Sequence, residues 1–482
     1  MSSTKKNIIF QTVYQVLNTC LPLITSPYLA RSLGAEMQGV FSYTNSIVNY
    51  FSLFAMLGVV NYGTRTISKS LSTKEDVSGL FWNIYALQFI MSFGAFCCYC
   101  AYCVLFGTNY LLVDILQGLY LLSAWLDINW FYFGLGNFKF TIIRSTIIRV
   151  TTVVCILLFV KTPADLWVYT LLMGGSFFFS SFVLWFKLPR YVSLSFWRMV
   201  KASKILSHLK PNILLFIPIL AMSVYHVMDK TMLGILSTYK QVGFYYNADK
   251  VINIPIGIIS GLGTVLLPKV SLLKETQEQT SVMDYCERAL ELSISVSVAM
   301  CFGLAAISFE FTPLFFGAGF SPCIMLIVAL APVLIVKSLA IMMRMLYLIP
   351  YNKEKIFIQS VFLGAISNFV ANILLIPHYG AMGAVISTFL AEFVACFWQL
   401  FLVRNEMNIK NVLKETFIYV VCGILMLGCI RICASFLGSS WLGLSLEIIL
   451  GGFIYVLINI IYWYRKRPEM MHLVMEVVHR KK

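Results

Sequence analysis

The chain has 482 residues, of which 59% are hydrophobic and 12% charged, and its mean hydropathy is +0.83. Ordinary globular domains carry about 25% charged residues, so this composition excludes a typical water-soluble protein. The net charge is +15, but the lysines and arginines lie between apolar segments rather than along one soluble face. We therefore attribute the charge to membrane topology and expect no nucleic-acid partner.

Apolar segments recur from one end of the chain to the other. A membrane-spanning helix needs about 20 mostly apolar residues, and about fourteen such windows are present. They are residues 8–30, 38–63, 79–106, 110–134, 142–161, 165–187, 209–236, 245–268, 285–316, 322–349, 355–376, 381–403, 412–437 and 441–464. The sequence therefore predicts an all-α polytopic membrane protein. The first segment follows residues 1–6 with no cleavage site, so we expect no removable signal peptide.

The distribution of basic residues predicts the orientation of these helices. Most of the 36 lysines and arginines fall in segments that the alternation of helices places on one side, whereas the opposite loops hold only Arg31, Lys161 and Lys240. Because basic residues accumulate in cytoplasmic loops, both termini are predicted to be cytoplasmic. Residues 190–208 and the tail at 470–477 are amphipathic, and we expect both to lie on the inner leaflet.

An internal repeat divides the chain. Residues 39–49 match residues 243–253 at a constant shift of 204, aligning Asn45 with Asp249 and Asn49 with Asn253. An even number of predicted helices separates the partners, so the two halves run in the same direction.

This pattern predicts two six-helix lobes, with two helices appended. The expected domains are 1–200 for the first lobe, 201–404 for the second, and 405–482 for the last two helices and the amphipathic tail. A second match, between residues 132–145 and 347–360 at a shift of 215, places the same loop in each lobe.

Polar groups inside the spans are the best candidates for a site. An ionisable side chain in the bilayer costs at least about 2.5–3.5 kcal/mol, so it normally faces a water-filled cavity or a partner. Lysines and arginines in these positions favour an anionic ligand, since they supply charge and hydrogen-bond donors. Two alternatives remain open: internal ion pairs that fix helix packing, and basic side chains that extend to the membrane surface.

The sequence contains no nucleophile elbow, phosphate-binding loop or zinc-ligand spacing. We therefore expect a protein that is not an enzyme, with no metal or cofactor, driven by mass action or by a coupling ion, H⁺ or Na⁺. Cys97, Cys100 and Cys103 share one helix face, but cysteine also packs well inside apolar helices, and we expect that role here.

Four stretches, together with the helix number, carry a family resemblance. They are residues 28–39, 229–234, 242–250 and 376–388, the last leading to Glu392. With them the chain resembles the Wzx-type flippases of O-antigen and polysaccharide repeat units, in the superfamily that includes the MATE exporters and the lipid II flippases.

The resemblance implies a MATE-like fold with two lobes around a central cavity that opens alternately to each side. It also implies flipping of a polyprenyl-pyrophosphate-linked oligosaccharide from the cytoplasmic to the outer leaflet of a bacterial inner membrane, with polysaccharide polymerase and ligase machinery as possible partners. A MATE-like cation-coupled drug antiporter and a lipid II flippase remain as alternatives. A membrane-embedded glycosyltransferase would need a large outer loop, and every outer loop here is short.

The cationic cavity surface would receive the pyrophosphate, and carboxylates would bind the coupling ion. The candidates for headgroup binding are Arg31, Lys230, Lys250, Arg344, Asn45, Asn49, Asn247 and Asn253. The candidates for ion coupling are Asp127, Asp229, Asp249 and Glu392.

Overall fold

The computed structural model describes residues 21–73, 76–195, 199–275 and 279–479, and within them it contains helices and no strand. Twelve of the described helical segments are long and apolar enough to cross a membrane. Residues 21–32 are helical as well, and the rest of the predicted first span lies outside the described residues. The predicted class, an all-α polytopic membrane protein, is confirmed, and the expected number of spans is compatible with the structure.

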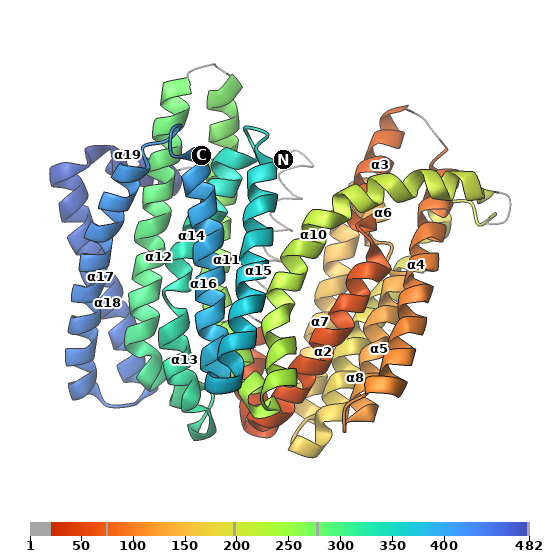
Figure 1. The fold of residues 1–482 in the computed structure, drawn as a ribbon, viewed down its shortest axis with the longest axis horizontal. Helices are drawn as coiled ribbons and strands as arrows, with labels where there is room; N and C mark the ends of the chain where they lie inside the picture. Colours follow the sequence, from red (N-terminus) through yellow and green to blue (C-terminus); the bar gives the residue numbers. More distant parts are fainter. Residues whose placement is uncertain (1–20, 74–75, 196–198, 276–278, 480–482) are drawn as a thin grey trace. The chain divides into compact units, whose positions relative to one another are not determined.

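The chain separates into two compact units, Met1–Gly234 and Ile235–Lys482. Figure 1 shows the helices of the first unit in red to yellow-green. They are α2 (Gly34–Met56), α3 (Val59–Thr73), α4 (Val77–Phe106), α5 (Leu111–Leu126), α6 (Asn129–Gly134), α7 (Phe138–Phe159), α8 (Leu166–Trp185) and α10 (Ala202–Leu236), with the short 3₁₀ turns η1 (Pro163–Asp165) and η2 (Leu188–Arg190).

The second unit is coloured green to blue in Figure 1. Its helices are α11 (Tyr239–Glu275), α12 (Gln279–Phe315), α13 (Pro322–Leu330), α14 (Val333–Met343), α15 (Glu354–Tyr379), α16 (Ala381–Val403), α17 (Ile409–Leu437), α18 (Trp441–Lys466) and α19 (Pro468–His479). A 3₁₀ turn, η3 (Ala318–Phe320), precedes α13, and a π-helical segment, η4 (Arg344–Leu348), follows α14.

Three predicted spans are interrupted. The predicted helix at 38–63 breaks between α2 and α3, where Leu57 and Gly58 adopt positive φ angles of 38° and 75°. A Cβ on Gly58 would lie 3.1 Å from the carbonyl oxygen of Asn212, so the break also lets the α10 backbone approach closely. The predicted span at 110–134 is interrupted between α5 and α6, and the predicted span at 322–349 is interrupted between α13 and α14.

The amphipathic tail packs on protein. Met470 and Leu473 on α19 are buried in the core of the second unit with residues of α12 and α18, and the side chain of Val477 lies outside those described. The prediction that this apolar face rests on the leaflet is therefore wrong for Met470 and Leu473, because neighbouring helices cover it. In the other amphipathic stretch residues 196–198 lie outside the described residues, and the Lys201 amide donates to Asn83 Oδ1 on α4 at 3.0 Å.

Candidate functional site

Polar side chains recur at helical spacing along α2 and form a stripe made of Ser42, Asn45, Ser46, Asn49 and Ser52. Part of this polar stripe makes hydrogen bonds to α5. Asn45 Nδ2 donates to Gln117 Oε1 at 3.1 Å, and Gln117 Nε2 donates to Thr44 Oγ1 at 3.0 Å. Asn49 Nδ2 donates to Asn45 Oδ1, one turn earlier, at 3.0 Å. Gln117 is fully buried and Asn45 is half-buried. Because buried amides need hydrogen-bond partners, Asn45 and Gln117 satisfy each other, and this part of the stripe serves the packing of α2 on α5.

A second face of the same stripe contacts α10. Ser46 Oγ and Thr231 Oγ1 are hydrogen-bonded at 2.8 Å, and Thr231 Oγ1 also donates to Tyr50 Oη at 3.3 Å. Asp229 and Lys230 precede this threonine on α10, Asp229 buried and Lys230 half-buried. The first unit thus gathers two candidate charged residues next to the polar stripe of α2.

The second unit repeats the local geometry on α11. Asn253 Nδ2 donates to Asp249 Oδ1 at 2.9 Å, which is the same i to i−4 bond that Asn49 makes with Asn45. Asn247 Nδ2 donates to the carbonyl oxygen of Gly243 at 2.8 Å and is buried. The repeat seen in the sequence therefore corresponds to an equivalent hydrogen bond in each unit.

Two candidate cations of the second unit lie over aromatic rings. Lys250 Nζ is 3.9 Å from the ring centroid of Tyr246, and Arg344 Cζ is 5.0 Å from that of Phe357. Within the described part of the chain neither forms an ion pair with a carboxylate, and Arg344 Nε has no hydrogen-bond partner. Arg344 begins the π-helical segment η4, a backbone form that occurs often at functional sites. These two cations are available to an anion.

Other candidates are placed differently. Arg31 is exposed in the helix at residues 21–32. Asp127 follows α5 and accepts hydrogen bonds from the Asn129 amide at 2.9 Å and from Asn129 Nδ2 at 2.6 Å. Arg144 on α7 in turn donates to Asn129 Oδ1 at 3.1 Å. Asp127 therefore joins the two halves of a broken helix and has a structural role whatever else it does.

Glu392 lies in an ion pair. Its Oε1 is 2.8 Å from Lys337 Nζ, and the two side chains are 7% and 16% exposed, so α14 and α16 are linked by a largely buried pair. A second pair joins α12 and α17, with Glu310 Oε2 at 2.8 Å from Arg431 Nη1. These contacts agree with the alternative in which charges inside the spans fix helix packing.

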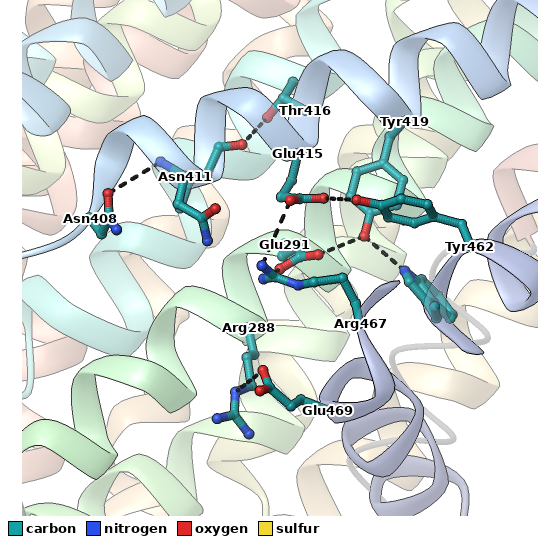
Figure 2. Close-up of polar contacts among 12 residues, drawn as sticks. Arg288, Glu291, Asn408, Asn411, Glu415, Thr416, Tyr419, Tyr462, Arg467 and Glu469 are labelled. Atoms are coloured by element: carbon teal, nitrogen blue, oxygen red, sulfur yellow. Dashed lines mark hydrogen bonds and ion pairs between the residues drawn. The ribbon is translucent and has the colours of Figure 1, made fainter. Parts of the chain in front are cut away.

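A five-residue polar cluster in the second unit was not among the sequence-based candidates. Glu291 on α12 and Glu415 on α17 are both buried, and Arg467, directly after α18, contacts both carboxylates (Figure 2). Tyr419 Oη donates to Glu291 Oε1 at 2.8 Å, and Tyr462 Oη donates to Glu415 Oε2 at 2.6 Å. We call these five residues the Arg467 cluster. It joins three helices at the point where the chain turns into α19.

Taken one by one, the positions of its members in the sequence do not indicate this cluster. Glu291 and Glu415 lie within about two turns of the predicted starts of their spans, where a charge is normally solvated. Arg467 belongs to a basic run that topology already explained. The sequence signal that indicates the cluster is Glu415 four residues before Tyr419 in one span, together with Tyr462 in the next.

The described residues contain no group of three or more histidine, cysteine or acidic side chains placed to hold a metal ion. Within the cysteine-rich stretch of α4, Cys97 and Cys100 are exposed and Cys103 is buried in the apolar core of the first unit.

The fold is similar to those of known lipid and drug transporters. A structure of the lipid II flippase MurJ in an inward closed conformation matches with a TM-score of 0.74 at 14% identity, covering 95% of this chain and 99% of that one. A multidrug resistance MATE family transporter of the MOP superfamily matches with a TM-score of 0.61 at 13% identity, covering 85% and 99%. At these identities the similarity shows the fold, and it confirms the expected MATE-like architecture.

Sequence comparison identifies the family. A protein of Shigella dysenteriae named "Putative O-antigen transporter" is 24% identical over 407 residues, which cover 82% of this chain and 99% of the relative. The family model for lipid II flippase MurJ matches residues 213–452, and the family model described as polysaccharide biosynthesis protein matches residues 4–274. Since the latter match extends over more than half of the chain, the protein belongs to the polysaccharide biosynthesis protein family.

Proposed function

We propose that the protein is a flippase that carries a polyprenyl-pyrophosphate-linked oligosaccharide, the repeat unit of an O-antigen, capsule or exopolysaccharide, from the cytoplasmic to the outer leaflet. The observation that carries this proposal is the match to the Shigella dysenteriae protein named "Putative O-antigen transporter" along 99% of that relative's length. The twelve apolar spans among the described residues and a MATE-like fold supply the architecture that alternating access needs.

The charge pattern supports an anionic substrate. Moving a hydrated pyrophosphate through hydrocarbon is prohibitive unless protein groups replace its water. Lys250 and Arg344 lie in the second unit without a carboxylate partner among the described residues, so their charge is not already neutralised. On the same helix, Asn253 is exposed and its amide donates to Asp249, whereas Asn247 is fully buried and donates to Gly243.

The direct test is a flipping assay on the purified full-length protein. Proteoliposomes would contain a fluorescent polyprenyl-pyrophosphate oligosaccharide, and the fraction accessible to a membrane-impermeant quencher would be followed in time. We expect the protein to accelerate exchange between leaflets, and protein-free liposomes to show none on the same timescale. A protein that leaves the exchange rate unchanged with several oligosaccharides would contradict the proposal.

A lipid II flippase is the second candidate, because the MurJ family model matches residues 213–452 and the MurJ structure has the same fold. The same assay separates the two, since lipid II differs from a polysaccharide precursor only in its sugar and peptide part. Faster flipping of lipid II than of every oligosaccharide tested would favour this candidate. Export of cationic drugs, the third possibility, would appear as drug efflux in cells that express the protein.

The proposed orientation places the protein in the inner membrane with both termini in the cytoplasm. Fusion of a fluorescent protein after Lys482 should give fluorescent cells, whereas alkaline phosphatase fused in the loop near Lys161 should be active. The opposite pattern would reverse the topology. In the proposed orientation, polysaccharide polymerase and ligase machinery would receive the substrate on the outer side.

Return of the empty carrier needs a bias, which a proton or sodium ion with different affinity for the two states would supply. The candidates for this role are Asp127, Asp229, Asp249 and Glu392. Glu392 is already paired with Lys337. If the flipping rate ignores imposed proton and sodium gradients, and also the neutralisation of all four carboxylates, transport is downhill and needs no coupling ion.

A further inference from the structure

A pocket of about 620 Å³ lies between α7 and α8 in the first unit. Its volume is within the range of small-molecule sites, about 300–1,000 Å³. Three of its lining residues are cationic, Lys139, Arg144 and Lys187, and no lining residue is acidic. None of the candidates derived from the sequence lies in it.

Two of these cations, Lys139 and Lys187, lie at helix ends. Lys139 is exposed in the first turn of α7, a turn that contains no acidic residue. A helix N-terminus carries a partial positive charge and favours anions, so a lysine there is poorly accommodated unless an anion is near. Lys187, two residues beyond the end of α8, is half-buried with its Nζ 4.2 Å from the ring centroid of Phe140. Two lysines and a helix end thus present positive charge to one small volume.

The rest of the lining is apolar and accessible from outside the unit. Ile143 and Ile147 on α7 are 41% and 60% exposed, and Ile148 and Val183 complete the wall. A ligand that satisfies both ends of the pocket therefore combines an anionic group with a hydrocarbon chain. The lysines belong to the predicted cytoplasmic side, where anionic phospholipids attract basic segments.

We propose that this pocket binds an anionic phospholipid of the cytoplasmic leaflet, with its phosphate between Lys139 and Lys187 and one acyl chain along Ile143 and Ile147. Basic pockets between membrane helices on the cytoplasmic side bind such headgroups in other proteins. Arg144 is buried and donates to the Ser180 carbonyl oxygen and to Asn129 Oδ1, so protein groups hold its guanidinium in place. The proposal does not depend on which substrate the protein transports.

Binding can be measured by native mass spectrometry on the delipidated full-length protein with phosphatidylglycerol as the probe. Each basic residue near a lipid surface contributes about 1 kcal/mol, so Lys139→Gln with Lys187→Gln should weaken the tightest-bound phosphatidylglycerol about 30-fold. A double variant of Lys161→Gln and Arg190→Gln removes the same charge outside the pocket and should leave this affinity unchanged. Size-exclusion profiles would verify that both double variants remain folded.

The chain-binding half has its own test. Ile147→Trp would fill the apolar wall and should displace the lipid, whereas Val154→Trp, at an exposed position two turns further along α7, should not. Phosphatidylcholine, which is zwitterionic, should bind at least about tenfold more weakly than phosphatidylglycerol. Inorganic phosphate should not compete, because it gains nothing from the apolar wall.

Three results would overturn the proposal. The first is equal phosphatidylglycerol affinity in the pocket variant and its charge-matched control. The second is displacement of the lipid by inorganic phosphate at millimolar concentration, which would make the pocket a simple anion site. The third is occupancy by a polyprenyl diphosphate in preference to phosphatidylglycerol, which would assign the pocket to the transported substrate.

Discussion

Arg467 is the residue on which the Arg467 cluster depends. One guanidinium faces two buried carboxylates, Glu291 and Glu415, whose remaining oxygens accept from Tyr419 and Tyr462. Desolvation of three charges is expensive, and their mutual attraction offsets it only while all partners are present. Removal of the cation is therefore more damaging than the absence of the whole cluster would be.

We predict that Arg467→Gln destabilises the protein by about 3–5 kcal/mol, because it leaves buried carboxylates without their cation. The measurement is the melting temperature of the detergent-solubilised protein. Arg465→Gln is the matched control, since Arg465 lies exposed in the last turn of α18. Adding Glu291→Gln and Glu415→Gln to Arg467→Gln should recover part of the loss. If the single variant melts like the wild type, the cluster is not structural.

The sequence predicts individual polar contacts only where a pattern repeats. The shift of 204 residues pointed to Asn49 and Asn253 together, and each donates to the residue four positions earlier. Contacts between distant positions cannot be predicted in this way. Arg467 meets Glu291 across 176 residues, and nothing local in either segment specifies the other. Whether the candidate site residues contact a substrate stays a prediction.

At the scale of helices, close packing is concentrated at particular glycines. Gly234 ends the stretch 229–234, and a Cβ there would lie 2.0 Å from Cδ2 of Tyr43 on α2. Tyr43 is itself buried in the repeated motif of α2. The stretch 229–234, which carries part of the family resemblance, therefore contacts the repeated motif of α2, and this contact gives the glycine a steric explanation.

We predict that Gly234→Ala costs about 1–3 kcal/mol, the usual range for overpacking a tight interface. Gly257→Ala is the control, because a Cβ at Gly257 on α11 would meet nothing within 4 Å. Melting temperatures of the two variants in the same detergent should differ, with only Gly234→Ala lowered. Equal melting temperatures would mean that Tyr43 moves aside at little cost.

Hydrogen bonds to Glu406, which follows α16, connect this segment to residues that precede α15. Glu406 accepts from both Lys353 Nζ and Tyr347 Oη. The hydrogen bond from Lys353, followed by that from Tyr347, holds the pKa of Glu406 below its ordinary value of 4.5. A depressed carboxyl pKa stabilises the folded state above the unfolded pKa, and this contribution is lost as the pH falls through the folded pKa.

We therefore predict that Glu406→Gln lowers stability at pH 7, and that the difference from wild type shrinks as the pH falls below 4.5. Because the Glu406 side chain is 40% exposed, solvent screening limits the effect to about 1 kcal/mol or less. Melting temperatures between pH 7 and pH 3 would measure it, with Asp284→Asn, an exposed position on α12, as control. A difference that stays constant over this range would show that the charge of Glu406 is irrelevant.

Most helices could be predicted from the sequence, and their interruptions could not. Hydropathy places α16 at residues 381–403 and ends α17 at 437, both as the structure has them. Hydropathy does not predict the breaks at Gly58, Asp127 and Pro332. Glycine, proline and single polar residues also occur inside continuous membrane helices, where neighbouring groups satisfy the backbone hydrogen bonds. Pro377, for example, lies inside α15, and the helix continues past it.

At the scale of the whole chain, four cations inside the spans are of two kinds. Lys337 and Arg431 are paired with Glu392 and Glu310. Lys250 and Arg344 have no carboxylate partner in the described ranges 21–73, 76–195, 199–275 and 279–479. Because an isolated cation in a bilayer is costly, an unpaired one is expected to serve a ligand.

This division predicts opposite outcomes for substitutions that remove the same charge. Lys250→Gln and Arg344→Gln should each slow flipping of the pyrophosphate-linked oligosaccharide at least about tenfold, since a hydrogen bond to a charged group contributes about 1.5–3 kcal/mol. Protein abundance and melting temperature should stay near those of the wild type. The flipping assay in proteoliposomes, normalised to reconstituted protein, measures the rate.

Lys337→Gln should do the reverse. It leaves Glu392, 7% exposed, without its cation, so the expected effect is lower abundance and a lower melting temperature, while the protein that remains folded transports normally. Lys355→Gln, exposed in the first turn of α15, controls for charge alone and should change neither property. If Lys337→Gln slows transport as strongly as Arg344→Gln at equal abundance, paired and unpaired cations act alike. The pyrophosphate would then have to compete with Glu392 for Lys337, and the ion pair would open during each transport cycle.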